Sequence, residues 1–192
     1  SMLEVKKGIN TLSKNLKPVL LLGKTGTGKE SVARAIHAQS VKSDLPFIKL
    51  NCSFRQKQAI QTQLFKRKDK ENKIGSNFVS GEKVVLLSNI ESLSKGLQEK
   101  LVEALQNTSN PESSFEFLPN RLFISSTENL GDLVEKGKFH KGLFSCFDET
   151  TLLIPELKNH SGSISVITKD FWEEKKRELN TILPKIEEEV FT

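Results

Sequence analysis

The chain has 192 residues, which suits one globular domain with room for a small appendage. Its hydrophobic fraction of 36% and charged fraction of 28% are ordinary for a folded protein in water, and its net charge is only +5. No apolar run approaches the roughly 20 residues that cross a membrane, and the N-terminus has no signal-peptide pattern, so we expect a cytoplasmic protein without a membrane partner.

The cysteines and histidines show no metal-binding pattern. Cys52 and Cys146 are far apart and form no CxxC pair, which suits free thiols in a reducing compartment. The three histidines have no ligand spacing, so we expect no metal site.

Helix-like and strand-like segments alternate along the chain. Residues 3–16 carry apolar side chains at helical spacing and end before Pro18. Residues 19–22 form a short continuous apolar run, typical of a strand buried on both faces of a parallel sheet. The later segments are a helix at 31–39, a strand at 47–50, a helix at 59–65, a strand at 84–87, a helix at 93–105, a strand at 121–126, a helix at 130–136 and a strand at 150–154.

This alternation predicts an α/β fold in which a parallel five-stranded sheet has helices on both faces and binds ligands at the carboxyl ends of its strands. Residues 107–119, with two prolines and several serines, are interpreted as a loop. The basic run at 66–73 is typical of a solvated loop, with contact to nucleic acid or an acidic partner as the alternative. We assign residues 3–157 to the domain core and 158–192 to a helical tail, either the start of a second subdomain or a linker.

A glycine-rich turn between the first strand and the second helix gives the strongest functional signal. In such a turn several backbone N–H groups point one way and bind phosphate oxygens, aided by the positive end of the helix dipole. A lysine adds a charge that reaches the terminal phosphates. The predicted phosphate-binding residues are Gly23, Lys24, Thr25, Gly26, Thr27, Gly28, Lys29 and Glu30.

One position in this turn departs from the general phosphate-loop pattern. Ser or Thr normally follows the lysine and binds Mg²⁺, whereas this chain has Glu30. Thr27 lies one turn earlier and is a poor substitute.

Residues 25–37 closely resemble the AAA+ central domain of the sigma-54-dependent transcriptional activators, which are bacterial enhancer-binding proteins. The likeness continues in order over about residues 3–157. It implies a three-layer P-loop NTPase (AAA+) fold and ATP or ADP as the bound nucleotide. The further segments that resemble the family are 46–52, 64–65, 97–106, 123–127 and 153–157.

The resemblance also indicates that catalytic groups have been lost. The family's Walker B strand ends in Asp-Glu, and the matching positions here are the neutral Ser88 and Asn89. Asn51 matches the switch asparagine that bonds the Walker B Glu, so its partner is expected to be missing. The sensor I asparagine is either replaced by Glu128 or shifted to Asn129 by a small gap.

Three further family features have no match. The stretch 139–146 corresponds to the arginine-finger segment and contains no arginine, although His140 or Lys141 could supply some charge. The Gly-Ala-Phe-Thr-Gly-Ala loop that contacts sigma-54 is replaced by the shorter basic segment between Phe65 and Val84. The Gly-Asn-Val-Arg-Glu-Leu lid motif does not occur in the chain.

Together these features lead to the hypothesis of an ATP- or ADP-binding, hydrolysis-deficient module with a regulatory or assembly role in a bacterial transcription regulator, with Mg²⁺ binding weak or absent. The partners implied are AAA+ subunits of the same or a homologous chain, RNA polymerase or other transcription machinery, and DNA only through domains outside this chain. Two alternatives stay open. One is an active AAA+ ATPase with relocated groups, namely Glu91, Glu128 and His140 or Lys141. The other is a nucleotide-free interaction scaffold.

Overall fold

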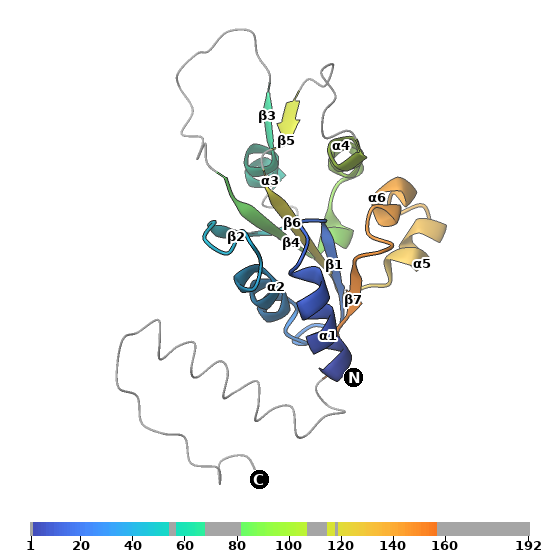
Figure 1. Cartoon of the computed structure of the whole chain (residues 1–192). Helices are drawn as coiled ribbons and strands as arrows, with labels where there is room; N and C mark the ends of the chain where they lie inside the picture. The colour runs from blue at the N-terminus through green and yellow to red at the C-terminus, as the bar shows by residue number, and fades with distance from the viewer. Residues whose placement is uncertain (1, 54–56, 68–81, 107–114, 118, 157–192) are drawn as a thin grey trace.

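The computed structural model describes residues 2–53, 57–67, 82–106, 115–117 and 119–156. Five of its strands form one sheet in the order β2-β4-β6-β1-β7, and every neighbouring pair is parallel. Figure 1 shows this sheet at the centre of the molecule. The strands are β1 (Val19–Leu22), β2 (Phe47–Asn51), β4 (Val84–Ser88), β6 (Arg121–Ser126) and β7 (Thr151–Leu153).

Helices cover both faces of the sheet, as the three-layer prediction requires. One buried cluster joins α1 and α2 to side chains such as Leu21, Leu86 and Phe123. The other joins the remaining helices to side chains such as Leu20 and Ile124 on the opposite face. The helices are α1 (Met2–Leu12), α2 (Lys29–Ala38), α3 (Lys57–Leu64), α4 (Lys95–Gln106), α5 (Leu130–Glu135) and α6 (Lys141–Ser145), with a 3₁₀ turn, η2 (Ile90–Ser92), after β4.

The central strands are apolar on both faces because both faces are covered. All six residues of β6 and the first four residues of β4 are buried, and their alternate side chains enter the two clusters. The continuous apolar runs in the sequence therefore correspond to the buried parallel strands, and the predicted fold class is confirmed.

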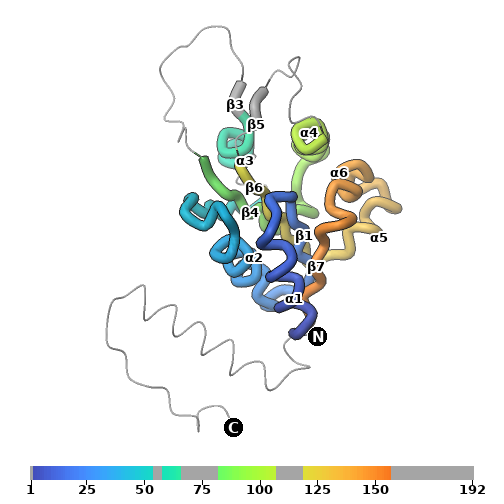
Figure 2. The backbone as a smooth tube through the Cα atoms, viewed as in Figure 1, coloured from blue at the N-terminus to red at the C-terminus, as the bar shows by residue number. Residues whose placement is uncertain are grey.

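The first helix packs against the same face as α2. Figure 2 traces the blue N-terminal helix across the sheet beside β7. A Cβ atom on Gly8 would lie only 2.6 Å from the Leu152 side chain, which shows how closely α1 approaches β7. The helix ends at Leu12, and the guanidinium of the buried Arg121 donates to the Leu12 carbonyl oxygen.

The loop prediction for residues 107–119 is wrong in part. Residues Phe115–Phe117 form β5, which pairs antiparallel with β3 (Phe65–Arg67) in a small separate sheet. The helix predicted at 59–65 accordingly ends at Leu64, where the chain enters β3. Most of the basic run at 66–73 and the predicted tail at 158–192 lie outside the described residues.

Two smaller features were not predicted. The five-residue helix α6 has no recognisable amphipathic repeat, and η2 inserts one short turn between β4 and α4. None of the helices in the described ranges is both long and apolar enough to cross a membrane.

Candidate functional site

The glycine-rich turn leaves β1 at Leu22 and enters α2 at Lys29, at the carboxyl edge of the sheet. Gly26 and Gly28 have φ angles of +82° and +81°, a left-handed conformation that side chains disfavour. The Thr27 hydroxyl donates to the Lys24 carbonyl at 2.9 Å and so closes the turn. This geometry fits the predicted phosphate loop.

The start of the loop is held by the ends of two neighbouring strands. The Gly23 N–H donates to the Ser126 carbonyl at the end of β6, at 3.3 Å. A Cβ atom on Gly23 would lie 2.7 Å from the Ile154 carbonyl oxygen, just after β7. Glycine is therefore needed here for close packing, since no larger residue fits without a backbone shift.

Lys29 begins α2 with its ammonium turned back over the loop. It donates to the carbonyls of Gly23 at 2.5 Å and Lys24 at 2.8 Å. Burial lowers the pKa of Lys29, and the negative charge of Glu91 opposes that shift. The side chain therefore lies where a phosphate bound by the loop would meet it.

The carboxylate of Glu30 is committed to two cations. It accepts from Lys49 on β2 at 2.5 Å and from Arg34, one turn further along α2, at 2.9 Å. The hydrogen bond from Lys49 is the main reason why the pKa of Glu30 is lowered, and the bond from Arg34 adds to it. Glu30 thus fastens α2 to β2, which gives a structural reason for glutamate at this position.

The Glu30 ion pairs predict a pH-dependent contribution to stability. A lowered carboxyl pKa in the folded state means that the contribution is present above the ordinary carboxyl pKa and is lost as the pH falls through the lowered value. We expect Glu30→Gln to reduce the free energy of unfolding at pH 7 by less than about 1 kcal/mol, because solvent screens these partly exposed pairs. Urea unfolding at neutral and at acidic pH measures this, and an equal deficit at both would contradict it.

The positions that match Walker B carry no charge. The Ser88 hydroxyl donates to the Leu50 carbonyl at 3.3 Å. Asn89 follows β4 in a left-handed conformation, with φ +56°, and its side-chain amide donates to the Asn51 Oδ1 atom at 3.3 Å. Asn51 therefore bonds the residue that stands where the family has its Walker B glutamate, and that residue is the neutral Asn89.

The two candidates for the sensor I position are exposed, and their hydrogen bonds are local. Glu128 is exposed, and its backbone closes a turn on the Ser126 hydroxyl. The Asn129 side chain caps α5 by accepting from the Gly131 N–H at 3.0 Å. The residue that faces the site from the end of β6 is instead Thr127.

Thr127 hydrogen-bonds the carboxylate of Glu91, a contact that the sequence alone did not indicate. Its hydroxyl donates to Glu91 Oε1 at 2.7 Å, and its N–H donates to the same atom at 3.3 Å. The other oxygen, Oε2, is buried and has no hydrogen-bond partner in the described structure. Since β4 and β6 are parallel neighbours, residues just beyond their ends meet, and this register is the signal that could have indicated the pair.

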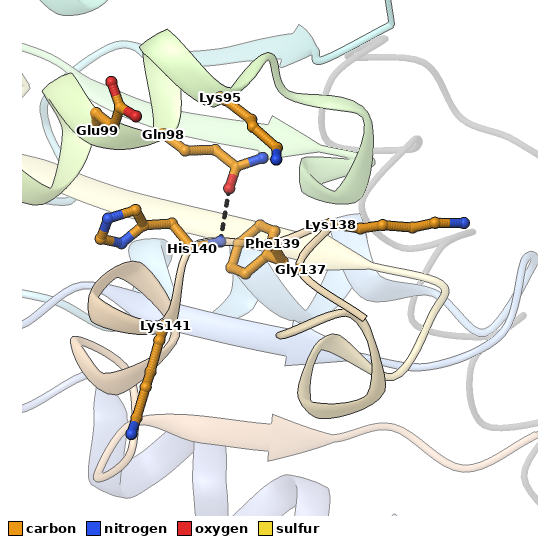
Figure 3. Close-up of a pocket in the computed structure, with 8 residues that line it drawn as sticks. All are labelled: Lys95, Gln98, Glu99, Gly137, Lys138, Phe139, His140 and Lys141. Atoms are coloured by element: carbon orange, nitrogen blue, oxygen red, sulfur yellow. Dashed lines mark hydrogen bonds between the residues drawn. The ribbon is translucent and has the colours of Figure 1, made fainter. Parts of the chain in front are cut away.

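The segment that matches the arginine fingers borders a different part of the molecule. A cavity of about 280 Å³ lies between α4 and the start of α6, and Figure 3 draws the side chains that line it. The buried Gln98 side chain accepts from the His140 N–H at 2.8 Å and so joins the two walls. The cavity is lined by Lys95, Gln98, Glu99, Gly137, Lys138, Phe139, His140 and Lys141. His140 and Lys141 are exposed there.

Among the described residues, no group of three or more His, Cys, Asp or Glu side chains could hold a metal ion. Both cysteines are free thiols, and Cys52 is buried beside the site. Burial, and secondarily the charge of Glu91, raise the pKa of Cys52 to about 12.

Two curated proteins illustrate the similarity in sequence. The chain is 33% identical over 172 residues to the HTH-type transcriptional regulatory protein TyrR of Haemophilus influenzae, covering 87% of this chain and 54% of that protein. It is 30% identical over 186 residues to a Nif-specific regulatory protein of Azospirillum brasilense, covering 89% and 29%. The chain therefore spans between about a third and half of the length of these relatives.

Solved structures show the same fold. NtrX from Brucella abortus in complex with ADP superposes with a TM-score of 0.72 at 21% identity, covering 99% of this chain and 43% of NtrX. The NtrX complex with ATP superposes with a TM-score of 0.69, also at 21% identity, covering 99% and 45%. The family model described as the Sigma-54 interaction domain matches residues 1–152. With its parallel sheet and phosphate loop, this chain belongs to the Sigma-54 interaction domain family.

Proposed function

We propose that this chain is the nucleotide-binding domain of a sigma-54-activator-like transcription regulator, that it binds ATP or ADP with little dependence on Mg²⁺, and that it hydrolyses ATP negligibly. The observation that supports this most is that an intact phosphate loop occurs together with uncharged residues at the end of β4. Gly26, Gly28 and Lys29 keep the geometry for phosphates, while Ser88 and Asn89 offer no carboxylate.

Binding rests on the loop backbone and Lys29. The backbone N–H groups at the start of α2 and the helix dipole favour anions, and the Lys29 ammonium adds a positive charge. NtrX, which shares the fold, has been solved with ATP and with ADP. Nucleotide binding is thus proposed from the loop and supported by a structural neighbour.

The residues around the loop do not fit a tightly bound Mg²⁺ ion. Glu30, which replaces the usual Ser or Thr, is occupied by Lys49 and Arg34. The hydroxyls of Thr27 and Ser88 donate to backbone carbonyls. Glu91 alone remains, and one carboxylate is a weak substitute for the usual set.

ATP hydrolysis needs positioning and charge-neutralising groups that this site does not bring together. Phosphoryl transfer depends on positioning and on neutralising charge, and an arginine finger alone contributes about 10³–10⁵ in rate. By the family resemblance, the finger segment is 139–146, which contains no arginine. We therefore propose that the domain acts through its nucleotide-bound state as a regulatory or assembly module, with other AAA+ subunits or the transcription machinery as partners.

One observation favours an active enzyme as the second candidate. Glu91 lies beside the loop and is fixed by Thr127, so it could orient a water molecule. Of the other groups in that hypothesis, Glu128 is exposed and His140 and Lys141 border the separate cavity. The carboxylate would then act with the Lys29 ammonium but without an arginine to stabilise the transition state.

Calorimetric titration with ATP and ADP, each with and without Mg²⁺, tests the proposal together with a phosphate-release assay. We expect binding of nucleotide, a change of less than about tenfold on adding Mg²⁺, and turnover indistinguishable from a blank. Turnover at an ordinary kinase-like rate of about 1 s⁻¹ or more would support the enzyme instead. Absence of binding would favour the nucleotide-free scaffold.

A further inference from the structure

Glu91 is held rigidly at the edge of the phosphate loop. It lies in η2, directly after Ile90, whose side chain is fully buried in the core. The hydroxyl and the N–H of Thr127 both donate to one of its carboxylate oxygens. The side chain is therefore anchored at both ends, by the core below it and by the end of β6.

The anchor places the carboxylate beside the loop. Thr127 follows Ser126, whose carbonyl accepts from the Gly23 N–H at the start of the loop. Figure 1 shows β4, β6 and β1 adjacent in the sheet, so the end of β4 and the loop after β1 are separated by one strand. The charge of Glu91 is felt both by Lys29 on α2 and by Cys52 after β2.

The second oxygen of this carboxylate is unusual. Glu91 Oε2 is buried and accepts no hydrogen bond within the described residues. The ammonium of Lys29 donates to the Gly23 and Lys24 carbonyls. An ionised carboxylate with one oxygen shielded from water and unbonded acts strongly on another anion nearby, because little solvent screens it.

A nucleotide in this loop would place its phosphates in a known order. The loop backbone holds the inner phosphates, and the terminal phosphate of a triphosphate extends toward the carboxyl end of the strand that matches Walker B. In a site that binds Mg²⁺ well, the ion neutralises the charge there. Here Glu91 faces that region, and the residues around it do not fit the ion.

We propose that Glu91 makes this site select a nucleoside diphosphate over the triphosphate by repelling the terminal phosphate. This inference rests on the proposed nucleotide binding and adds a preference to it. The inner phosphates of ADP lie nearer the loop backbone, so they meet less of the repulsion. The domain would then remain in its diphosphate-bound state when both nucleotides are present.

Titration of ADP and ATP without Mg²⁺ into the wild type and into Glu91→Gln tests the preference. Glutamine keeps an oxygen for Thr127 but removes the charge. We expect the wild type to bind ADP about tenfold more tightly than ATP, and the variant to bind ATP about tenfold more tightly than the wild type does, with ADP nearly unchanged. Glu135→Gln, which removes an exposed carboxylate at the end of α5, should change neither affinity.

A second variant guards against a folding defect. Thr127→Val removes the hydroxyl that fixes the carboxylate and should reduce the preference in the same direction, and thermal unfolding checks that both variants are folded. An unchanged ADP-to-ATP ratio in a folded Glu91→Gln protein overturns the inference while the proposed function stands. A large gain in ATP affinity with Mg²⁺ that Glu91→Gln abolishes overturns it too, because Glu91 would then be a metal ligand. If neither nucleotide binds the wild type, both proposals fail.

Discussion

Replacing Phe123 with alanine is expected to lower the free energy of unfolding by about 3–5 kcal/mol. Phe123 is fully buried at the centre of the sheet, in the cluster that joins α1 and α2 to the strands. Its ring lies 6.0 Å from that of Phe47, and the Arg121 guanidinium lies 4.8 Å from its centre. Truncation leaves a cavity and also removes the ring that faces a buried cation, so both effects act in the same direction.

Urea unfolding of two further variants separates these contributions. Phe123→Leu keeps most of the volume and should cost clearly less than alanine does. Leu153→Ala removes a side chain that is 69% exposed on β7 and should change stability by less than about 0.5 kcal/mol. A loss for Phe123→Ala no larger than that for Leu153→Ala would contradict the central place of Phe123 in the core.

The buried strands were predictable because a run of apolar residues indicates directly that both faces of the strand are buried. A continuous apolar run such as 84–87 is typical of a strand covered on both faces, and the glycine-rich turn after 19–22 is typical of a strand-to-helix connection. The fold and the phosphate loop were therefore accessible from local pattern. The segments that local pattern misread are those stabilised by distant partners.

The β3–β5 pair illustrates this limit. Its strands have three residues each and are separated by nearly fifty positions, so neither has a period long enough to recognise. The serines and Pro111 before Phe115 favour a loop. The Asn89–Asn51 bond and the Glu91–Thr127 pair have the same cause. Each joins residues that follow different strands, and only the strand order brings them together.

Lys29→Ala is expected to weaken the binding of ADP and ATP by about 100-fold, because it removes hydrogen bonds to charged phosphate oxygens that contribute about 1.5–3 kcal/mol each. The ammonium lies over the loop, against the carbonyls of Gly23 and Lys24. A bound phosphate would attract it more strongly than these carbonyls do, since a phosphate carries full negative charge and a carbonyl only a partial one. The backbone N–H groups remain in the variant, so we expect residual binding.

Calorimetry on two variants makes this result specific to the ammonium. Lys29→Met keeps the aliphatic stem and should lose binding as alanine does, whereas Lys17→Ala removes an exposed lysine that pairs with Glu149 at the surface and should leave it unchanged. The loop should keep its shape in all three variants, because the hydrogen bonds that the Thr27 hydroxyl and the Gly23 N–H donate do not involve Lys29. If Lys29→Met binds nucleotide as tightly as the wild type, the affinity arises from the loop backbone alone, and the charge of Lys29 does not bind the phosphates.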